Sequence, residues 1–376
     1  MSKKVIYIVK TDLHYYPPCM AQIRMLKKSR VNIEVWFASS NQSAIDILEK
    51  ENIDYICLGE SYKPVSKLDK IKNWIEFRRK ISKQLSKIDK VILNDIFFWI
   101  GTAESAIPLI GKMKKYNYIL TMLELLDDPA NKYKLKLFGL MARKAKSIVV
   151  CEQTRAYLIK YWFKLKTLPY IMPNKPYGLK TTRRIVPTCD KTREAIDKIK
   201  DKKFIIYQGI FQNVNYMVEL AKAMKEINSD YYLVIMGFDL YNTGMYHKIK
   251  TIYDKVIQLE SLSAPLHLEV TSYADIGLVF YEGNSLNHAF CAPNKIYEYS
   301  AFGIPSLGNN IPGLENTIGK AKAGICVEFK KELLIKALND LINNYLLYKK
   351  NSHKFYESTD NQITIDMLIR DNQINT

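Results

Sequence analysis

The sequence predicts an α/β protein in which two parallel sheets, each covered by helices, follow one another along the chain. Three observations lead to this prediction. Short apolar runs rich in β-branched residues alternate with amphipathic helical segments, as in sheets whose two faces are both buried. The alternation stops in a proline-rich stretch, 169–187, and then begins again. The chain of 376 residues also has the length expected of at least two domains.

The first half of the chain supplies one set of alternating elements. Its opening apolar run is too short for the core of a signal peptide and fits a buried strand. A long basic helix lies in the middle of this half. The expected strands are Val5–Val9, Asn32–Ala38, Tyr55–Leu58, Lys90–Leu93, Tyr118–Met122 and Ser147–Cys151, and the expected helices are Pro18–Lys28, Ser43–Glu51 and Leu68–Leu85.

The second half repeats the alternation. The expected strands are Lys203–Tyr207, Tyr231–Met236, Val256–Leu259, Ile276–Tyr281, Pro305–Leu307 and Ile325–Val327, and the expected helices are Val214–Ile227 and Asn294–Phe302. Together the halves predict two facing Rossmann-like domains with a cleft between them. We expect these domains at 1–176 and 177–350, followed by a helical tail at 351–376 that packs back near the first domain.

The net charge of +18 is unevenly distributed along the chain. Residues 1–176 carry +16, whereas residues 177–376 carry only +2. A basic half indicates an anionic partner, such as phosphate groups or an acidic membrane surface. Nucleic acid is not expected, because the sequence contains no RNP motif, helix-turn-helix signature or zinc finger.

Other classes of protein are excluded by local patterns. No stretch reaches the ~18 apolar residues that a transmembrane helix needs. The six cysteines are scattered without a CxxC pair, which fits a reducing cytosol better than a disulfide framework. The five histidines show neither HExxH nor a paired arrangement, so no metal is expected.

The segment 293–313 combines residues suited to bind a phosphorylated ligand. Pro293 and Asn294 begin the expected helix, with Asn294 as its cap, and a helix N-terminus favours a phosphate. Lys295 adds a positive charge in the first turn. Glu298, one turn further, is placed to accept hydrogen bonds from ribose hydroxyls. The same spacing also fits an ordinary capped helix with a surface pair between Lys295 and Glu298.

The residues from Ala274-Asp275 through Pro293-Asn-Lys-Ile-Tyr-Glu298 to Gly303-Ile-Pro305 resemble the nucleotide-sugar half of GT-B glycosyltransferases. The resemblance is strongest to glycosyltransferase family 4, of the surface and capsular polysaccharide type, and Tyr207-Gln-Gly209 matches a turn of that family. It implies that Glu298 holds the ribose and that Lys295 faces the diphosphate. The donor-binding residues implied are Glu298, Lys295, Asn294, Gly209, Gln208, Asn287 and Gly237.

This sequence departs from the family pattern at three places. One is the turn after the first strand, where the family has a glycine-rich turn and this chain has Asp12-Leu-His-Tyr-Tyr-Pro-Pro, without glycine. The family often has a glutamate eight positions before the one at Glu298, where this chain has Phe290, and Asn287 or His288 is the expected replacement. The family's arginine and lysine after the Tyr207-Gln-Gly209 turn are also missing.

Polar residues after the strands of the first half are candidates for the group that accepts the proton of an acceptor hydroxyl. Asp95 and Asp127 are favoured because they follow expected strands most directly, and Glu124 and His14 come next. Each of them also fits a helix cap or a turn.

Three segments of the basic half, 67–87, 132–146 and 156–168, combine lysine with apolar residues at helical spacing. Basic amphipathic helices with aromatic residues suit an anionic membrane surface. The same pattern also fits the solvated back of an ordinary helix. The residues expected to contact the membrane or the acceptor are Lys132, Lys134, Lys136, Arg143, Lys144, Lys160, Trp162 and Lys164.

The resemblance and the charge together predict a glycosyltransferase on the cytoplasmic face of the cell membrane. It would move a sugar from a nucleoside diphosphate, UDP or GDP, to a hydroxyl of a lipid-linked or surface-polysaccharide glycan. The motif implies retention of anomeric configuration, with no metal and no cofactor besides the nucleotide sugar. Two alternatives stay open: a nucleotide-sugar epimerase of the same fold, and a non-catalytic glycan-binding or scaffold subunit.

Overall fold

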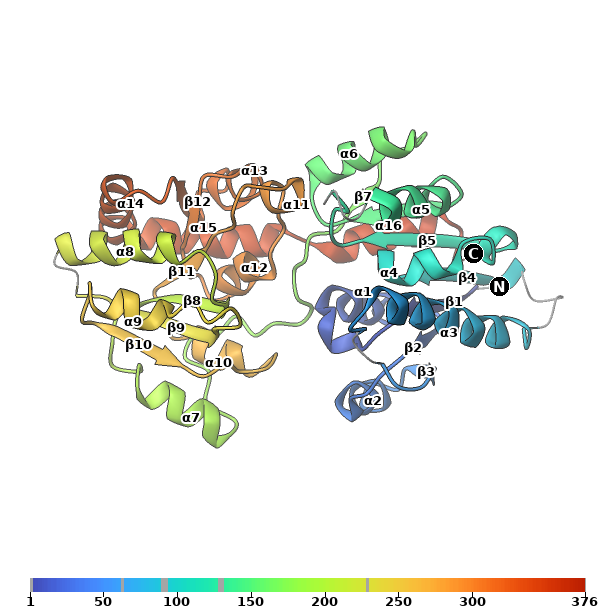
Figure 1. The fold of residues 1–376 in the computed structure, drawn as a ribbon, viewed down its shortest axis with the longest axis horizontal. Helices are drawn as coiled ribbons and strands as arrows, with labels where there is room; N and C mark the ends of the chain where they lie inside the picture. Colours follow the sequence, from blue (N-terminus) through green and yellow to red (C-terminus); the bar gives the residue numbers. More distant parts are fainter. Residues whose placement is uncertain (1–2, 62–63, 89–93, 128–131, 228–229, 376) are drawn as a thin grey trace. The chain divides into compact units, whose positions relative to one another are not determined.

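A computed structural model describes residues 3–61, 64–88, 94–127, 132–227 and 230–375. The chain forms two compact units (Figure 1). Unit 1 comprises Met1–Tyr177 together with Asp360–Thr376, and unit 2 comprises Gly178–Thr359. The tail expected at 351–376 is therefore divided, since its first residues complete a helix of unit 2 and the rest forms a helix of unit 1.

Unit 1 contains a seven-stranded sheet among its described residues, and the strand order is β3-β2-β1-β4-β5-β6-β7. All neighbouring strands are parallel. β1 is central, with Val5 opposite Ile33 on one side and Phe97 on the other. The strands are β1 Lys4–Val9, β2 Ile33–Phe37, β3 Asp54–Cys57, β4 Ile96–Ile100, β5 Asn117–Met122, β6 Ser147–Val150 and β7 Tyr170–Ile171.

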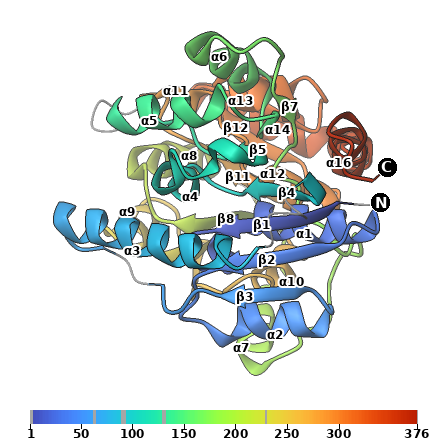
Figure 2. The same ribbon diagram turned by 90° about the vertical axis from the view of Figure 1, so that its right-hand side faces the viewer.

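Helices cover both faces of this sheet, because alternate residues of its strands point to opposite faces and both sets are apolar. Val5, Tyr7 and Val9 of β1 join one core, and Ile6 and Ile8 join the other. Figure 2 shows α1 and α16 on one side of the sheet and α3 and α5 on the other. The helices are α1 Pro17–Lys28, α2 Gln42–Lys50, α3 Lys67–Leu85, α4 Ala103–Ala106, α5 Lys132–Ala142, α6 Gln153–Phe163 and α16 Asn361–Asp371.

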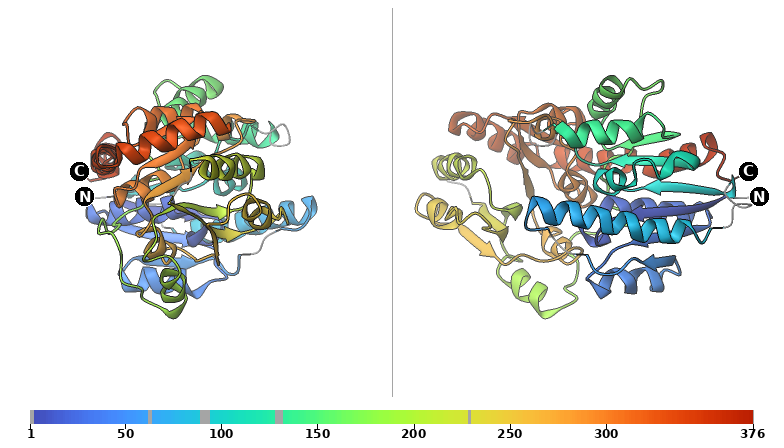
Figure 3. Two further views of the ribbon diagram at one scale, coloured as in Figure 1. Left: turned by 90° about the vertical axis from the view of Figure 1, so that its left-hand side faces the viewer. Right: turned by 45° about the vertical axis from the view of Figure 1, so that its right-hand side comes forward.

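Unit 2 contains a parallel six-stranded sheet of order β10-β9-β8-β11-β12-β13 among its described residues, again with helices on both faces (Figure 3, left). The strands are β8 Phe204–Ile210, β9 Tyr232–Phe238, β10 Val256–Leu259, β11 Ile276–Val279, β12 Ser306–Asn309 and β13 Gly324–Val327. The helices are α7 Asp190–Asp197, α8 Val214–Glu226, α9 Met245–Lys250, α10 His267–Thr271, α11 Leu286–Ala289, α12 Asn294–Ala301, α13 Pro312–Leu314, α14 Lys331–Asn343 and α15 Tyr345–Ser358.

The two successive parallel sheets confirm the predicted α/β class, and most expected strands coincide with observed ones to within one or two residues. One central strand, β4 at Ile96–Ile100, is not among the expected strands. The strand expected at Lys90–Leu93 lies outside the described residues. Every residue of β4 is buried, so the longer of two neighbouring apolar runs occupies the middle of the sheet.

Candidate nucleotide site in unit 2

A pocket of about 360 Å³ opens at the carboxyl ends of the strands of unit 2. In its sheet, β8 and β11 are neighbours at the point where the strand order reverses, which is where ligands bind in open parallel sheets. The pocket is lined by the ends of these strands, by the loop after β10, by α10 and by the first turn of α12. Its lining residues are Gln208, Gly209, Met236, Ser261, Leu262, His267, Tyr281, Pro293, Asn294, Lys295 and Glu298.

Glu298 is held in the pocket by a chain of hydrogen bonds. Gln208 Nε2 donates to Glu298 Oε2 at 2.7 Å, and Thr271 Oγ1 donates to Gln208 Oε1 at 2.7 Å. Because the carboxylate can only accept, it selects the NH2 end of the Gln208 amide, and the Thr271 hydroxyl contacts the oxygen end. His267 Nε2 lies 3.4 Å from the other oxygen, Glu298 Oε1. Glu298 is 7% exposed, so its carboxylate is oriented before any ligand arrives.

Lys295 supplies the positive charge of the pocket. Its Nζ lies 5.3 Å from the centre of the Tyr207 ring and beside Gly209, where a Cβ atom would come within 3.3 Å of it. Burial lowers the pKa of Lys295 to about 8, although Glu298 nearby favours the charged form. Bringing an anion to this ammonium would offset the desolvation and raise its pKa again.

The pKa of Lys295 leads to a pH-dependent affinity for a diphosphate. Below pH 8 the ammonium is charged, and UDP affinity should change little between pH 7 and 8. Above pH 8 the lysine loses its proton in the free protein, so affinity should fall by up to about tenfold per pH unit. Isothermal titration calorimetry from pH 7 to 9 measures this. The Lys295→Met variant, which lacks the titrating group, should show a flat profile, and a fall of equal slope in it would contradict the assignment.

Two facing glycines bring the backbones of β8 and β9 unusually close beside the pocket. Gly209 and Gly237 are register partners, and a Cβ atom on Gly237 would lie 1.7 Å from the carbonyl oxygen of Gly209. Gly209 itself has φ of +119°, which disfavours a side chain. Only glycine therefore leaves room here for both the strand pairing and the ammonium of Lys295.

Five residues expected to bind the donor do gather in this pocket: Gln208, Gly209, Asn294, Lys295 and Glu298. Asn294 is the first residue of α12 and not its cap, since Pro293 occupies the N-cap position and no side chain caps this helix. Gln208 and Gly209 belong to β8 itself, which continues to Ile210.

Two other expected donor residues lie outside the pocket. Gly237 lines an adjacent cavity of about 620 Å³, which shares Ser261 with it. Asn287 lies on the short helix α11 and does not line the pocket.

The sequence interpretation missed His267, Thr271 and Ser261. Ser261 follows β10 by two residues, so the rule that ligands bind at strand ends applied to it as well. His267 and Thr271 lie on α10, a helix of five residues that is too short to show a periodic pattern. Their role depends on a side-chain network that spacing does not reveal.

Asp275, the acidic residue of the Ala274-Asp275 motif, has a structural role. Its carboxylate accepts a 2.9 Å hydrogen bond from the backbone N–H of Phe204 and lies 3.7 Å from Arg183. These contacts join the starts of β8 and β11, at the edge of the sheet opposite the pocket. The motif therefore fixes the two strands that form the pocket.

The structure revises the candidate bases of unit 1. Asp95 is exposed and immediately precedes β4, so it lies at the amino end of that strand and not at a carboxyl end, where the acceptor was expected. The strand that Asp95 was expected to follow lies outside the described residues. Glu124 and Asp127 do follow β5, and His14 follows β1 in an exposed turn against Tyr15. Glu104, on α4, also follows a strand, because α4 comes directly after β4. It was not identified from the sequence.

The basic helices α5 and α6 border a groove of about 1140 Å³ within unit 1. Most of the expected contact residues on them are at least partly exposed, but Lys134 is not. Its ammonium is buried against Glu104 at 2.7 Å, so the expectation that it faces a membrane is wrong. The groove is lined by apolar side chains that include Leu137, Leu140, Tyr157, Tyr161 and Trp162, with Lys136, Arg143, Lys160 and Lys164 among them.

In the part of the chain that the structure covers, no helix combines the length and the hydropathy needed to cross a membrane. Within the same residues, no three His, Cys, Asp or Glu side chains come together as a metal site.

Unit 2 resembles a known protein family in sequence. Residues 189–362 match the family model for glycosyl transferases of group 1, which covers nearly all of unit 2. A search of curated proteins found no match.

Solved structures resemble the whole chain. A glycosyltransferase from Rickettsia africae matches with a TM-score of 0.67 and 16% identity over 99% of this chain and 97% of that one. A sucrose-phosphate synthase from Thermosynechococcus elongatus matches with a TM-score of 0.71 and 15% identity over all of both chains. HepE from Anabaena, in complex with UDP and glucose, matches with a TM-score of 0.69 and 11% identity, again over both full chains. The shared fold is the GT-B fold of two Rossmann-like units.

Proposed function

We propose that this protein is a glycosyltransferase that takes a sugar from a nucleoside diphosphate and transfers it to a hydroxyl of a glycan acceptor. The observation that carries the proposal is the pocket formed by Gln208, Lys295 and Glu298 at the switch point of unit 2. It lies within the segment that matches group 1 glycosyl transferases. UDP and UDP-glucose complexes of the similar Anabaena protein favour a uridine nucleotide as the donor.

The positive groups of the pocket are suited to stabilise a departing diphosphate. Transfer breaks the bond between the anomeric carbon and the diphosphate oxygen, and negative charge develops on the departing diphosphate. Lys295 and the free N–H groups at the start of α12 would stabilise that charge, so no metal is needed in this proposal. The acceptor hydroxyl forms the new bond to the anomeric carbon, and its proton passes to a base, for which Glu124, Asp127 and His14 are the candidates. We propose that configuration is retained.

The role of Glu298 is tested by the Glu298→Gln variant. The amide keeps the size of the side chain but has only one acceptor oxygen, which can accept from Gln208 or face the ribose hydroxyls but not do both as the carboxylate does. We expect UDP affinity to fall roughly tenfold, as for the loss of one hydrogen bond to a charged group. Calorimetric titration with UDP measures it. Thr317→Val, in a helical turn away from the pocket, is the control and should bind UDP normally. Unchanged affinity in Glu298→Gln would remove the ribose role.

The acceptor is proposed to be lipid-linked, with unit 1 docking on an anionic membrane surface at the inner face of the cell membrane. The groove between α5 and α6 supports this, since it combines apolar lining with the charges of Lys136, Arg143, Lys160 and Lys164. Tyr161 is 83% exposed and Leu140 is 46% exposed at the same place. Exposed aromatic and basic residues together suit the headgroup layer of an acidic bilayer.

Vesicle binding tests the docking surface. The full chain should sediment with vesicles that contain phosphatidylglycerol and not with phosphatidylcholine vesicles, and added salt should release it. Changing Lys136, Arg143 and Lys160 together to Gln should weaken binding by about 3 kcal/mol, or roughly a hundredfold. The matched control changes the exposed Lys336, Lys350 and Lys354 of unit 2 to Gln. Equal losses in both variants would contradict a specific surface on α5 and α6.

A further inference from the structure

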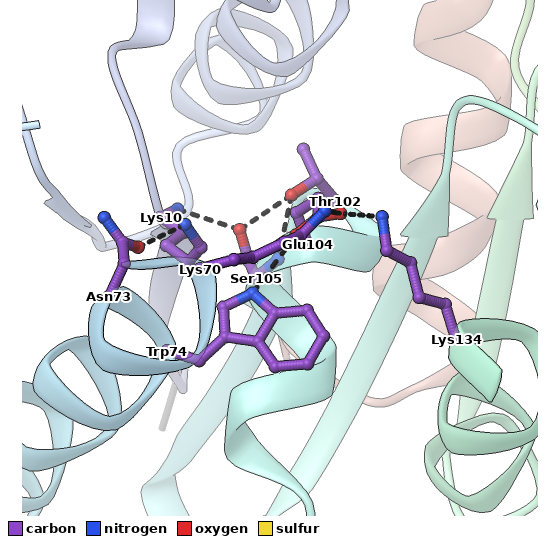
Figure 4. Close-up of polar contacts among 8 residues, drawn as sticks. All are labelled: Lys10, Lys70, Asn73, Trp74, Thr102, Glu104, Ser105 and Lys134. Atoms are coloured by element: carbon purple, nitrogen blue, oxygen red, sulfur yellow. Dashed lines mark hydrogen bonds and ion pairs between the residues drawn. The ribbon is translucent and has the colours of Figure 1, made fainter. Parts of the chain in front are cut away.

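Three lysines of unit 1 surround a single carboxylate (Figure 4). Lys134 Nζ lies 2.7 Å and Lys70 Nζ 3.6 Å from Glu104 Oε1, while the indole N–H of Trp74 donates to Glu104 Oε2 at 3.2 Å. Lys10, the third lysine, donates from Nζ to Asn73 Oδ1 at 2.6 Å. Three ammonium groups and one carboxylate leave two positive charges in excess.

The cluster lies where the strand order of the unit 1 sheet reverses. Lys10 comes directly after β1, and Glu104 lies on α4 just after β4, and these two strands are neighbours. The backbone N–H of Lys10 donates to Ser105 Oγ at 2.8 Å, which joins the two strand ends. This is the position in unit 1 that corresponds to the nucleotide pocket of unit 2, and ligands bind at such switch points.

The lysines repel one another in a partly buried setting. Burial lowers the pKa of Lys10, and Lys70 and Lys134 lower it further, against the opposing effect of Glu104. Burial and then Lys134 also lower the pKa of Lys70. Lys134 differs, because burial disfavours its charge but hydrogen bonds with Glu104 and Lys70 raise its pKa. An anion placed among the three ammonium groups would relieve this repulsion.

The cluster has both access and hydrogen-bonding capacity for a ligand. The side chain of Lys70 is 33% exposed, so solvent reaches the cluster from α3, whereas Lys134 on α5 is held beneath at 9% exposure. Each ammonium carries three N–H donors, and the contacts described above use only a part of them. Such a set of donors matches the three oxygens of a phosphoryl group.

We propose that Lys10, Lys70 and Lys134, oriented by Glu104, bind a phosphoryl group, and that this group belongs to the acceptor. The assignment to the acceptor rests on the proposed function, whereas the anion site stands on the cluster alone. Glu104 and Trp74 are positioning residues, since Glu104 pairs with two of the ammonium groups and Trp74 donates a hydrogen bond to its carboxylate.

Pyrophosphate is the probe, and its binding is measured by calorimetry. The measurements use the Lys295→Met variant, because this variant lacks the lysine through which pyrophosphate could bind in the unit 2 pocket. We expect this variant to bind pyrophosphate with a saturable isotherm. The double variant that also carries Lys70→Met should bind pyrophosphate at least tenfold more weakly. The double variant that carries Lys70→Arg instead keeps the charge and should bind nearly as well as Lys295→Met alone. Adding Lys72→Met, an exposed residue of the same helix, should have no effect. Circular dichroism confirms that each variant is folded.

The proposal would be overturned if Lys295→Met failed to bind pyrophosphate at millimolar concentration, or if Lys70→Met and Lys72→Met behaved alike. Wild-type UDP binding is measured in parallel and reports on the nucleotide pocket, so failure of the proposed function is seen separately. Two further ligands distinguish the source of the phosphoryl group. Tighter binding of farnesyl diphosphate assigns it to a lipid-linked acceptor, and tighter binding of glucose 6-phosphate assigns it to a soluble sugar phosphate.

Discussion

Replacing Lys295 with Met should lower the affinity for UDP roughly tenfold to a hundredfold and reduce turnover by a larger factor. The ammonium is the single lysine or arginine lining the described pocket, and a hydrogen bond between charged groups contributes about 1.5–3 kcal/mol. Turnover suffers more, because the charge on the departing diphosphate grows in the transition state. Calorimetry with UDP and a donor hydrolysis assay measure the two effects.

Lys336→Met provides the matched control for Lys295→Met. Lys336 is exposed on α14 of the same unit, and its loss should leave UDP affinity and turnover unchanged. If both variants lost affinity equally, the effect would reflect overall charge and not the pocket. If neither did, Lys295 would have no role in donor binding.

Replacing Gly237 with Ala should destabilise unit 2 by more than about 3 kcal/mol and disrupt nucleotide binding. The added Cβ would lie 1.7 Å from the backbone oxygen of Gly209, so no rotamer change can relieve the overlap. The strands must separate, and the adjacent Gln208 moves with them. For a unit of this size the loss corresponds to a fall in melting temperature of about 6–12 °C.

Gly244→Ala separates the two causes of the lost stability, which are the overlap with the Gly209 backbone and the positive φ. Gly244 also has a positive φ, +64°, but a Cβ atom there would meet nothing within 4 Å. It should therefore cost only about 1–2 kcal/mol, the penalty of the left-handed conformation. Differential scanning calorimetry compares the variants. Equal stability of Gly237→Ala and Gly244→Ala would show that the backbones of β8 and β9 separate easily.

The fold was predictable because its strands carry uninterrupted apolar runs. β1 packs alternate residues into two cores, so its whole run is hydrophobic and stands out from the helices. The central strand that the sequence did not reveal is β4, because its apolar run is separated from the preceding one only by Asn94 and Asp95, and the two runs look alike in composition. Without β4, Glu104 was not recognised as a residue that follows a strand.

The part of the site that is built from residues close in sequence could be predicted. Lys295 and Glu298 share one helix, so their spacing alone places them together. The hydrogen bonds from Gln208 and Thr271 join β8 and α10 to that helix, and such long-range contacts depend on tertiary packing. The same limit applies to Lys134, whose burial against Glu104 follows from the packing of α5 near α4 and not from its helical position.

The most direct test of the central claim is hydrogen–deuterium exchange of the full chain with and without saturating UDP, with GDP tested in the same way. If the pocket holds a nucleoside diphosphate, one nucleotide should protect the amides at the start of α12, residues 294–298, and those at the end of β8, residues 208–210. The Lys295→Met variant should lose that protection at the same nucleotide concentration. Unchanged exchange at both segments with millimolar UDP and GDP would contradict the account.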